Sequence, residues 1–198
     1  AAGDDPSKRP AFDMKLEALI PVLNREIPLK AHAHQANDIL TAIRIAKEFH
    51  VKLTLEHTTE GNLIVDELVK AGYPCAVGPS LGHATKFELQ NKTWTTPGVL
   101  AKAGCQVSII TDAPVTPQKY LSLCAAMAVR AGMEPYEALK AITINPAKHL
   151  GIEDRVGSLA VGKDADILIF SGDPLDGISL PDQVLIDGKL IENTSGQL

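Results

Sequence analysis

The stretch that decides the fold is residues 27–57, which open Ile-Pro-Leu-Lys-Ala-His-Ala-His (27–34) and close Leu-Thr-Leu-Glu-His (53–57). Each of these short apolar runs ends in histidine, and residues 37–49 between them have apolar side chains at helical spacing. A third run, Cys-Gln-Val-Ser-Ile-Ile-Thr-Asp (105–112), ends in a carboxylate. If these runs are parallel strands, His32, His57 and Asp112 leave the sheet at one edge, where two imidazoles and a carboxylate suit a divalent metal ion.

Strand-like runs alternate with helix-like segments on both sides of this stretch. The patterns predict strands over 28–34, 51–57, 73–77 and 106–111, and helices over 14–24, 37–49, 63–71, 97–104, 117–132, 135–142 and 146–150. Asn37 or Asp38 is the expected cap of one helix, and Asn145 that of the last. Because parallel strands need crossovers of this length, the alternation predicts a parallel sheet or barrel, and four units are half of an eight-stranded barrel.

The pattern changes after Gly151. Short apolar runs broken by glycines fill residues 156–170, and residues 183–191 contain Asp187-Gly188, the two-residue turn typical of a β-hairpin. This tail has too few strands to build a core of its own. We therefore expect two parts, an α/β part over residues 1–150 and a small β part over residues 151–198.

Composition excludes several classes of partner. The 198 residues are 45% hydrophobic, and the formal net charge of −5 is spread without long runs of one sign, which argues against a nucleic-acid or membrane partner. The apolar runs are too short to span a bilayer, and the polar residues 1–10 do not have the pattern of a signal peptide. The odd number of cysteines, Cys75, Cys105 and Cys124, indicates reduced thiols and a cytoplasmic protein.

Five motifs in order resemble one known family. They are His-Ala-His-Gln (32–35), Leu-Glu-His-Thr (55–58), Ile-Thr-Asp-Ala-Pro (110–114), Thr-Ile-Asn-Pro-Ala-Lys-His-Leu-Gly (143–151) and Val-Gly-Ser-Leu-Ala-Val-Gly-Lys-Asp-Ala-Asp-Ile-Leu-Ile-Phe (156–170). The chain resembles the C-terminal half of the amidohydrolase superfamily, in particular its imidazolonepropionase-like and prolidase-like members. The resemblance implies a partial (β/α)8 barrel, strands 5–8 with their helices, plus part of a small β-sandwich.

The resemblance also implies a site and a reaction. It implies hydrolysis of a C–N bond in an amide, cyclic amide or dipeptide, with a divalent metal, zinc first of all, that activates water. By position His32, His57 and Asp112 match the metal ligands, and Asp112 matches the general base. The family motif favours His32 over His34 as the ligand, although the choice stays open. His34 would then support a ligand, bind the substrate or be a simple loop histidine. His83 and Lys86, on the long loop after the third strand, are further candidates for binding a small-molecule substrate.

The chain departs from the family at its beginning. The family's first-strand His-x-His and its fourth-strand ligand have no match ahead of His32, so we expect a fragment that lacks ligands and is inactive by itself. The alternative is a catalytically incomplete structural or metal-binding piece. Because half a barrel exposes strand edges, such a piece is expected to pair with another copy or with a complementing N-terminal half.

Overall fold

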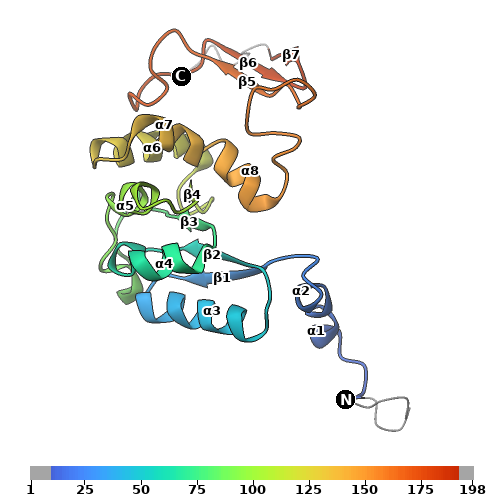
Figure 1. Ribbon diagram of the computed structural model, residues 1–198. Helices are drawn as coiled ribbons and strands as arrows, with labels where there is room; N and C mark the ends of the chain where they lie inside the picture. The colour runs from blue at the N-terminus through green and yellow to red at the C-terminus, as the bar shows by residue number, and fades with distance from the viewer. Residues whose placement is uncertain (1–9, 192–198) are drawn as a thin grey trace.

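A four-stranded parallel sheet lies at the centre of the molecule (Figure 1). The structure is a computed structural model and describes residues 10–191. The strands β1 (Leu29–Ala33), β2 (Leu53–His57), β3 (Cys75–Val77) and β4 (Val107–Ile109) pair in chain order. Ala33 is opposite His57, His57 opposite Val77, and Val77 opposite Ile109, so the carboxyl ends of the strands are level. The predicted parallel α/β arrangement is confirmed.

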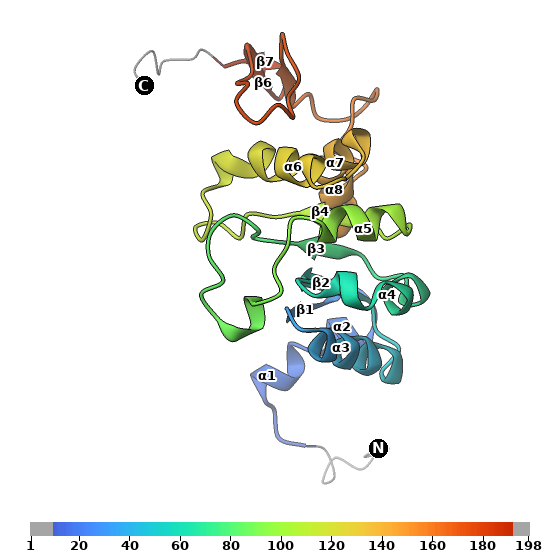
Figure 2. The same cartoon turned by 90° about the vertical axis from the view of Figure 1, so that its left-hand side faces the viewer.

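Helices follow the strands and cover the sheet (Figures 1 and 2). Their bounds are α3 (Ala36–Glu48), η2 (Gly61–Leu63), α4 (Val65–Ala71), η3 (Phe87–Leu89), α5 (Thr96–Lys102), η4 (Gln118–Tyr120), α6 (Leu121–Arg130), α7 (Pro135–Ala141) and α8 (Ile144–Leu150). Helix α3 buries Ile39, Ile43 and Ala46, which its 3.6-residue period places on one face. These side chains join one core with Leu53, Leu55, Leu68, Cys75, Val77, Leu100 and Val107.

A second core lies between β4 and the pair α6–α7. It contains Ile109, Cys124, Ala125, Ala128, Met133, Ala138 and Ala141, together with Leu175 from the tail. Small residues on α6 let this helix pack closely against its neighbours. Leu175 shows that the segment after α8 returns to the α/β part and contributes to its core.

The segment before β1 differs from the prediction. Residues 14–24 were expected to form one amphipathic helix, but they form two single turns, α1 (Met14–Glu17) and α2 (Ile20–Leu23). The expected apolar face stays largely in solvent, because Leu16 and Leu23 are more than half exposed. Figure 1 gives the reason: these turns extend away from the sheet and its helices, so an apolar stripe here meets little to pack against.

Two predicted helix caps are wrong. Helix α3 begins at Ala36 with Gln35 as its N-cap, two positions ahead of the expected Asn37 and three ahead of Asp38. Helix α8 begins after Thr143, which places Asn145 inside the helix, where its side chain is buried. The Asn145 Nδ2 donates to the carbonyl of Val107, 2.8 Å away, so this residue anchors α8 to β4 instead of capping it.

The tail forms a separate small antiparallel sheet, β5 (Ile167–Ile169), β6 (Gln183–Ile186) and β7 (Lys189–Leu190). Asp187 and Gly188 turn between β6 and β7 with φ of +50° and +73°, which confirms the predicted hairpin. This sheet lies beyond α6–α8, on the side away from β1 (Figure 2). Of the glycine-rich run 156–170, only the last part is a strand.

Candidate metal centre

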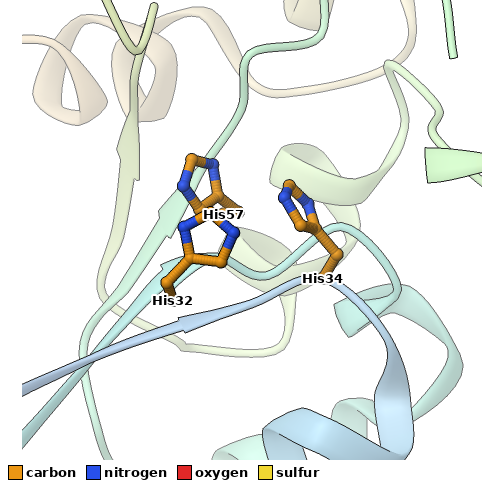
Figure 3. A group of neighbouring side chains, drawn as sticks. All are labelled: His32, His34 and His57. Carbon is orange, nitrogen blue, oxygen red and sulfur yellow. The ribbon is translucent and has the colours of Figure 1, made fainter. Parts of the chain in front are cut away.

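Three histidines meet where β1 and β2 end (Figure 3). His32 lies in β1, His34 directly follows it, and His57 is the last residue of β2. One ring nitrogen of each lies within 4.8 Å of one from each of the others. The ring centroid of His57 is 4.2 Å from that of His32 and 4.5 Å from that of His34. The structure thus brings together the two predicted histidines and the third whose role was left open.

His57 has a defined tautomer and orientation. Its Nδ1 lies 2.7 Å from the carbonyl oxygen of Gly78, and since a carbonyl can only accept, Nδ1 carries the proton and donates. In a neutral ring Nε2 is then unprotonated and available as a ligand. Metal-binding histidines are usually oriented in this way by a hydrogen bond from the other ring nitrogen.

The backbone at His57 is also unusual. His57 and Thr58 have φ of +73° and +41°, a region that residues other than glycine rarely adopt and that clusters at functional sites. Thr58 N–H donates to the Ala33 carbonyl at 3.0 Å, and Thr96 Oγ1 lies 3.3 Å from the carbonyl oxygen of Thr59. These bonds hold the turn after β2 against the end of β1 and the start of α5.

His34 is almost fully enclosed, with 4% of its surface exposed. Its Nδ1 lies 2.7 Å from Thr59 Oγ1, and its Nε2 lies 3.7 Å from a carboxylate oxygen of Glu88. Burial, helped by the neighbouring His57, lowers the pKa of His34 to about 4 although Glu88 acts in the opposite direction. His34 is therefore neutral at pH 7, which is the form of imidazole that binds metal ions.

Asp112 lies at the same edge of the sheet, three residues after β4 ends. Its side chain is exposed, its φ is +51°, and its carbonyl accepts from Val115 N–H at 2.9 Å in a tight turn. Within residues 10–191 the group of mutually close ligand atoms contains the three histidines but not Asp112. Its predicted role as ligand and base therefore stays a prediction.

The other two predicted site residues lie on the loop after β3 and are exposed. Lys86 Nζ lies 3.3 Å from Glu88, so its charge is shared with the carboxylate that approaches His34. The backbone carbonyl of His83 accepts from Lys92 Nζ at 3.2 Å. Two residues of this loop were not predicted as part of the site: Glu88, which approaches His34, and Gly78, whose carbonyl orients His57. The length of the loop indicated that it was functional, but no residue pattern identified the Gly78 carbonyl.

A polar network lies one residue before His57. Glu56 accepts from His149 Nε2 at 2.9 Å and Thr54 Oγ1 at 2.8 Å, and Lys30 Nζ lies 3.2 Å away. Burial raises the pKa of Glu56, but the hydrogen bonds from His149 and Thr54 outweigh it and bring the pKa down to about 2. His149 in this way ties α8 to β2.

An open cavity of about 930 Å³ lies at the opposite end of the strands. It is lined by the segment before β1, the chain entering β2 and the end of α8, including Arg25, Lys52 and Lys148. The histidine group does not line it. The candidate centre, in which His34 and His57 are buried and His32 is exposed, lies instead at the carboxyl edge of the sheet, the edge where barrel enzymes place their active sites.

The fold and the histidine group together define an α/β protein with a parallel sheet and a candidate metal centre at the carboxyl ends of its strands. Residues 23–191 match the family described as "Amidohydrolase family". The chain belongs to this family, as the motifs predicted. None of the helices in residues 10–191 has the length and apolar character needed to cross a membrane.

Individual relatives support the same assignment. The crystal structure of an amidohydrolase from Thermotoga maritima MSB8 superposes with a TM-score of 0.86 at 43% identity, covering 93% of this chain and 48% of that one. The amidohydrolase tasK of Hapsidospora irregularis is 29% identical over 89% of this chain and 18% of its own length. An imidazolonepropionase of Streptococcus pyogenes is 29% identical over 75% of this chain and 35% of its own. The chain thus spans half or less of each relative.

Proposed function

We propose that this chain carries part of the active centre of a metal-dependent hydrolase that cleaves a C–N bond in an amide, cyclic amide or dipeptide. Membership of the amidohydrolase family and the similarity to an imidazolonepropionase support this class of reaction. The observation that carries the proposal is the group of three histidines. In a neutral His57 ring, the hydrogen bond from Nδ1 to the Gly78 carbonyl leaves Nε2 without a proton and able to bind a metal ion.

The donor set fits a divalent ion, zinc in the first instance. Neutral imidazoles bind zinc without cancelling its charge, and His34 and His57 are buried as metal ligands commonly are. The chemistry such an ion supplies is a lowered pKa for water and a polarised carbonyl group. In this proposal His32 and His57 hold the ion with Asp112, and the Asp112 carboxylate accepts the proton of the attacking water.

His34 has a separate role in the proposal. Its Nε2 lies 3.7 Å from a carboxylate oxygen of Glu88, which in turn pairs with Lys86; both residues belong to the loop after β3. We place His34, Lys86 and His83 toward the substrate, with His34 as the alternative to His32 as ligand. A small molecule with a carboxylate would suit the Lys86 ammonium.

This chain is proposed to supply only part of the metal centre. We propose that β1–β4 are strands 5–8 of a (β/α)8 barrel, that residues 10–150 belong to this half, and that residues 151–191 belong to part of a small β-sandwich. Residues 1–9 and 192–198 of the two expected parts lie outside the described residues. The chain covers about half of the T. maritima relative. Ligands from a complementing N-terminal half would complete the centre, and the isolated chain would be inactive. Its free cysteines fit the reducing cytoplasm.

A second function is favoured by one observation: a catalytically incomplete structural or metal-binding piece that pairs with another copy or with its missing half. Much apolar surface is exposed on the segment between α8 and β5 and on the segment before β1, including Leu159, Val161 and Leu23. Such surface favours pairing with a second copy or with the missing half. Size-exclusion chromatography of the chain with and without zinc separates these cases: a monomer under both conditions contradicts self-pairing.

Zinc titration against a competing coloured chelator tests the centre directly. We expect His57→Asn to weaken zinc binding by about a hundredfold or more. His50→Asn is the matched control, because His50 is exposed, lies elsewhere and also has a positive φ, which asparagine tolerates. Equal zinc affinity in both variants contradicts the centre. In the complete enzyme, full activity of Asp112→Asn contradicts the role of Asp112 as base.

A further inference from the structure

A buried carboxylate beside the candidate centre has no part in the proposed chemistry. Glu60 lies in the turn after β2 and is only 7% exposed. Acidic side chains are almost never buried to this extent unless their oxygens are hydrogen-bonded. Its partners therefore indicate what it does.

Both oxygens of Glu60 accept hydrogen bonds, and each comes from a different segment. Oε2 accepts from the backbone N–H of Ala36 at 2.8 Å, and Oε1 accepts from the side-chain amide of Asn91 at 2.7 Å. The backbone N–H of Glu60 itself donates to the carbonyl of His34 at 2.9 Å. One residue thus joins three separate parts of the chain.

Each of these parts carries a residue of the histidine group or its surroundings. The first is the turn from β1 to α3, which contains His34. The second is the turn after His57, in which Glu60 itself lies. The third is the loop over residues 78–92, which we call the site loop; it begins with the Gly78 carbonyl that orients His57 and includes the Glu88 that approaches His34.

The bond to Ala36 explains why a carboxylate is used. Ala36 is the first residue of α3, and the side chain of its N-cap, Gln35, makes no capping bond to the described part of the helix. Glu60 supplies that cap from another segment, where the helix dipole favours a negative charge. The carboxylate is fixed by the helix, and its second oxygen is then presented to Asn91 in a defined position.

We propose that Glu60 is a positioning residue that clamps the site loop, through Asn91, to the turns that carry His34 and His57. The inference rests on the proposed function, since it concerns the rim of the same centre. The clamp fixes Glu88 beside His34 and holds the loop over the side on which a substrate would enter. Releasing it lets the loop move while the sheet and helices stay folded.

The fold has other supports that make this test possible. The turn after β2 stays held by Thr58 N–H to Ala33 and by Thr96 to Thr59 when the Asn91 bond is lost. Asn91 is itself exposed and lies outside both cores, so replacing it removes the bond without opening a core cavity. Trp94, the single tryptophan, is half-buried three residues further on and reports on the end of the loop.

The experiment compares Asn91→Ala, Glu60→Gln and the double variant, with Gln90→Ala as the matched control. Gln90 is an exposed neighbour on the same loop whose side chain makes no hydrogen bond within residues 10–191. We expect hydrogen exchange over residues 80–92 to become about tenfold faster in Asn91→Ala and Glu60→Gln, the factor that one hydrogen bond to a charged group represents. Acrylamide quenching of Trp94 should rise in the same two variants, and the control should match the parent chain.

The double variant tests the pairing itself. If Glu60 and Asn91 act as one clamp, the double variant exchanges no faster than the more affected single variant. Additive effects, or parental exchange rates in Asn91→Ala, overturn the proposal even if Glu60→Gln fails to fold. Zinc affinity is measured in parallel and should fall in Asn91→Ala but not in Gln90→Ala. A parent chain that binds no zinc refutes the metal centre, whereas the exchange rates still decide the clamp.

Discussion

Replacing Gly78 by alanine should damage both the fold and the candidate centre. Gly78 has φ of +138°, and a Cβ there would lie 2.2 Å from the carbonyl oxygen of Ile110, which belongs to the neighbouring strand segment. The backbone must move by roughly 1 Å to relieve that contact. Any such movement carries away the Gly78 carbonyl, which accepts from His57 Nδ1.

The cost can be assembled from its parts. Alanine in this backbone region costs about 1 to 3 kcal/mol. Forcing a methyl group against a packed backbone costs about 1 to 3 kcal/mol more. The weakened hydrogen bond to His57 adds about 1 kcal/mol. We therefore expect the free energy of unfolding to fall by about 3 to 7 kcal/mol. Zinc affinity should fall by about 10- to 100-fold because His57 loses its orienting partner.

Urea unfolding followed by circular dichroism measures the first effect, and the chelator competition measures the second. Gly72→Ala is the control: Gly72 also has a positive φ of +70°, but a Cβ there meets no atom of the described chain within 4 Å. It should lose only about 1 kcal/mol and keep its zinc affinity. The reasoning is refuted if Gly78→Ala is no less stable than Gly72→Ala and binds zinc equally well.

Three further predictions concern the cores. Leu55→Ala should lower the free energy of unfolding by about 3 to 5 kcal/mol, since Leu55 is fully buried, whereas Leu159→Ala at an exposed site should change it by less than about 0.5 kcal/mol in the same urea titration. Asn145→Ala should cost about 1 to 3 kcal/mol because it leaves the Val107 carbonyl without its donor; a loss no larger than at Leu159 contradicts this. Burial raises the pKa of Cys75 to about 12, so only about one thiol in ten thousand is ionised at pH 8. Iodoacetamide should therefore label Cys75 in urea but not in the native chain. Mass spectrometry that finds equal labelling under both conditions contradicts the burial.

The parallel sheet could be predicted because its signals are local. Apolar runs with β propensity end at His34, His57 and Asp112, and helical periods of suitable length separate them, so the alternation alone predicts the strand arrangement. The hairpin at Asp187-Gly188 was predictable for the same reason, since two adjacent residues carry the turn. The order of the five motifs predicted the family, and the match over residues 23–191 confirms that prediction.

What failed depended on contacts between distant segments. Asn145 is a good capping residue, but the Val107 carbonyl from β4 binds its amide instead. The apolar stripe at Leu16 and Leu23 predicts a helix face, yet the described residues offer it almost nothing to bury against. At the centre, histidines can be identified from sequence. The Gly78 carbonyl cannot, because every residue has a backbone oxygen, and the Glu60 clamp cannot, because its partners are distant in the sequence.

The hydrogen bonds that hold His34, His57, the turn after β2 and the site loop in place join residues between Ala33 and Thr96. During synthesis, all of these partners are therefore translated before α6–α8 and the β5–β7 sheet. The histidine group can assemble on the nascent chain without waiting for the C-terminal segments. Hydrogen exchange on stalled ribosome complexes would test this, since protection of residues 53–60 should precede the synthesis of α8.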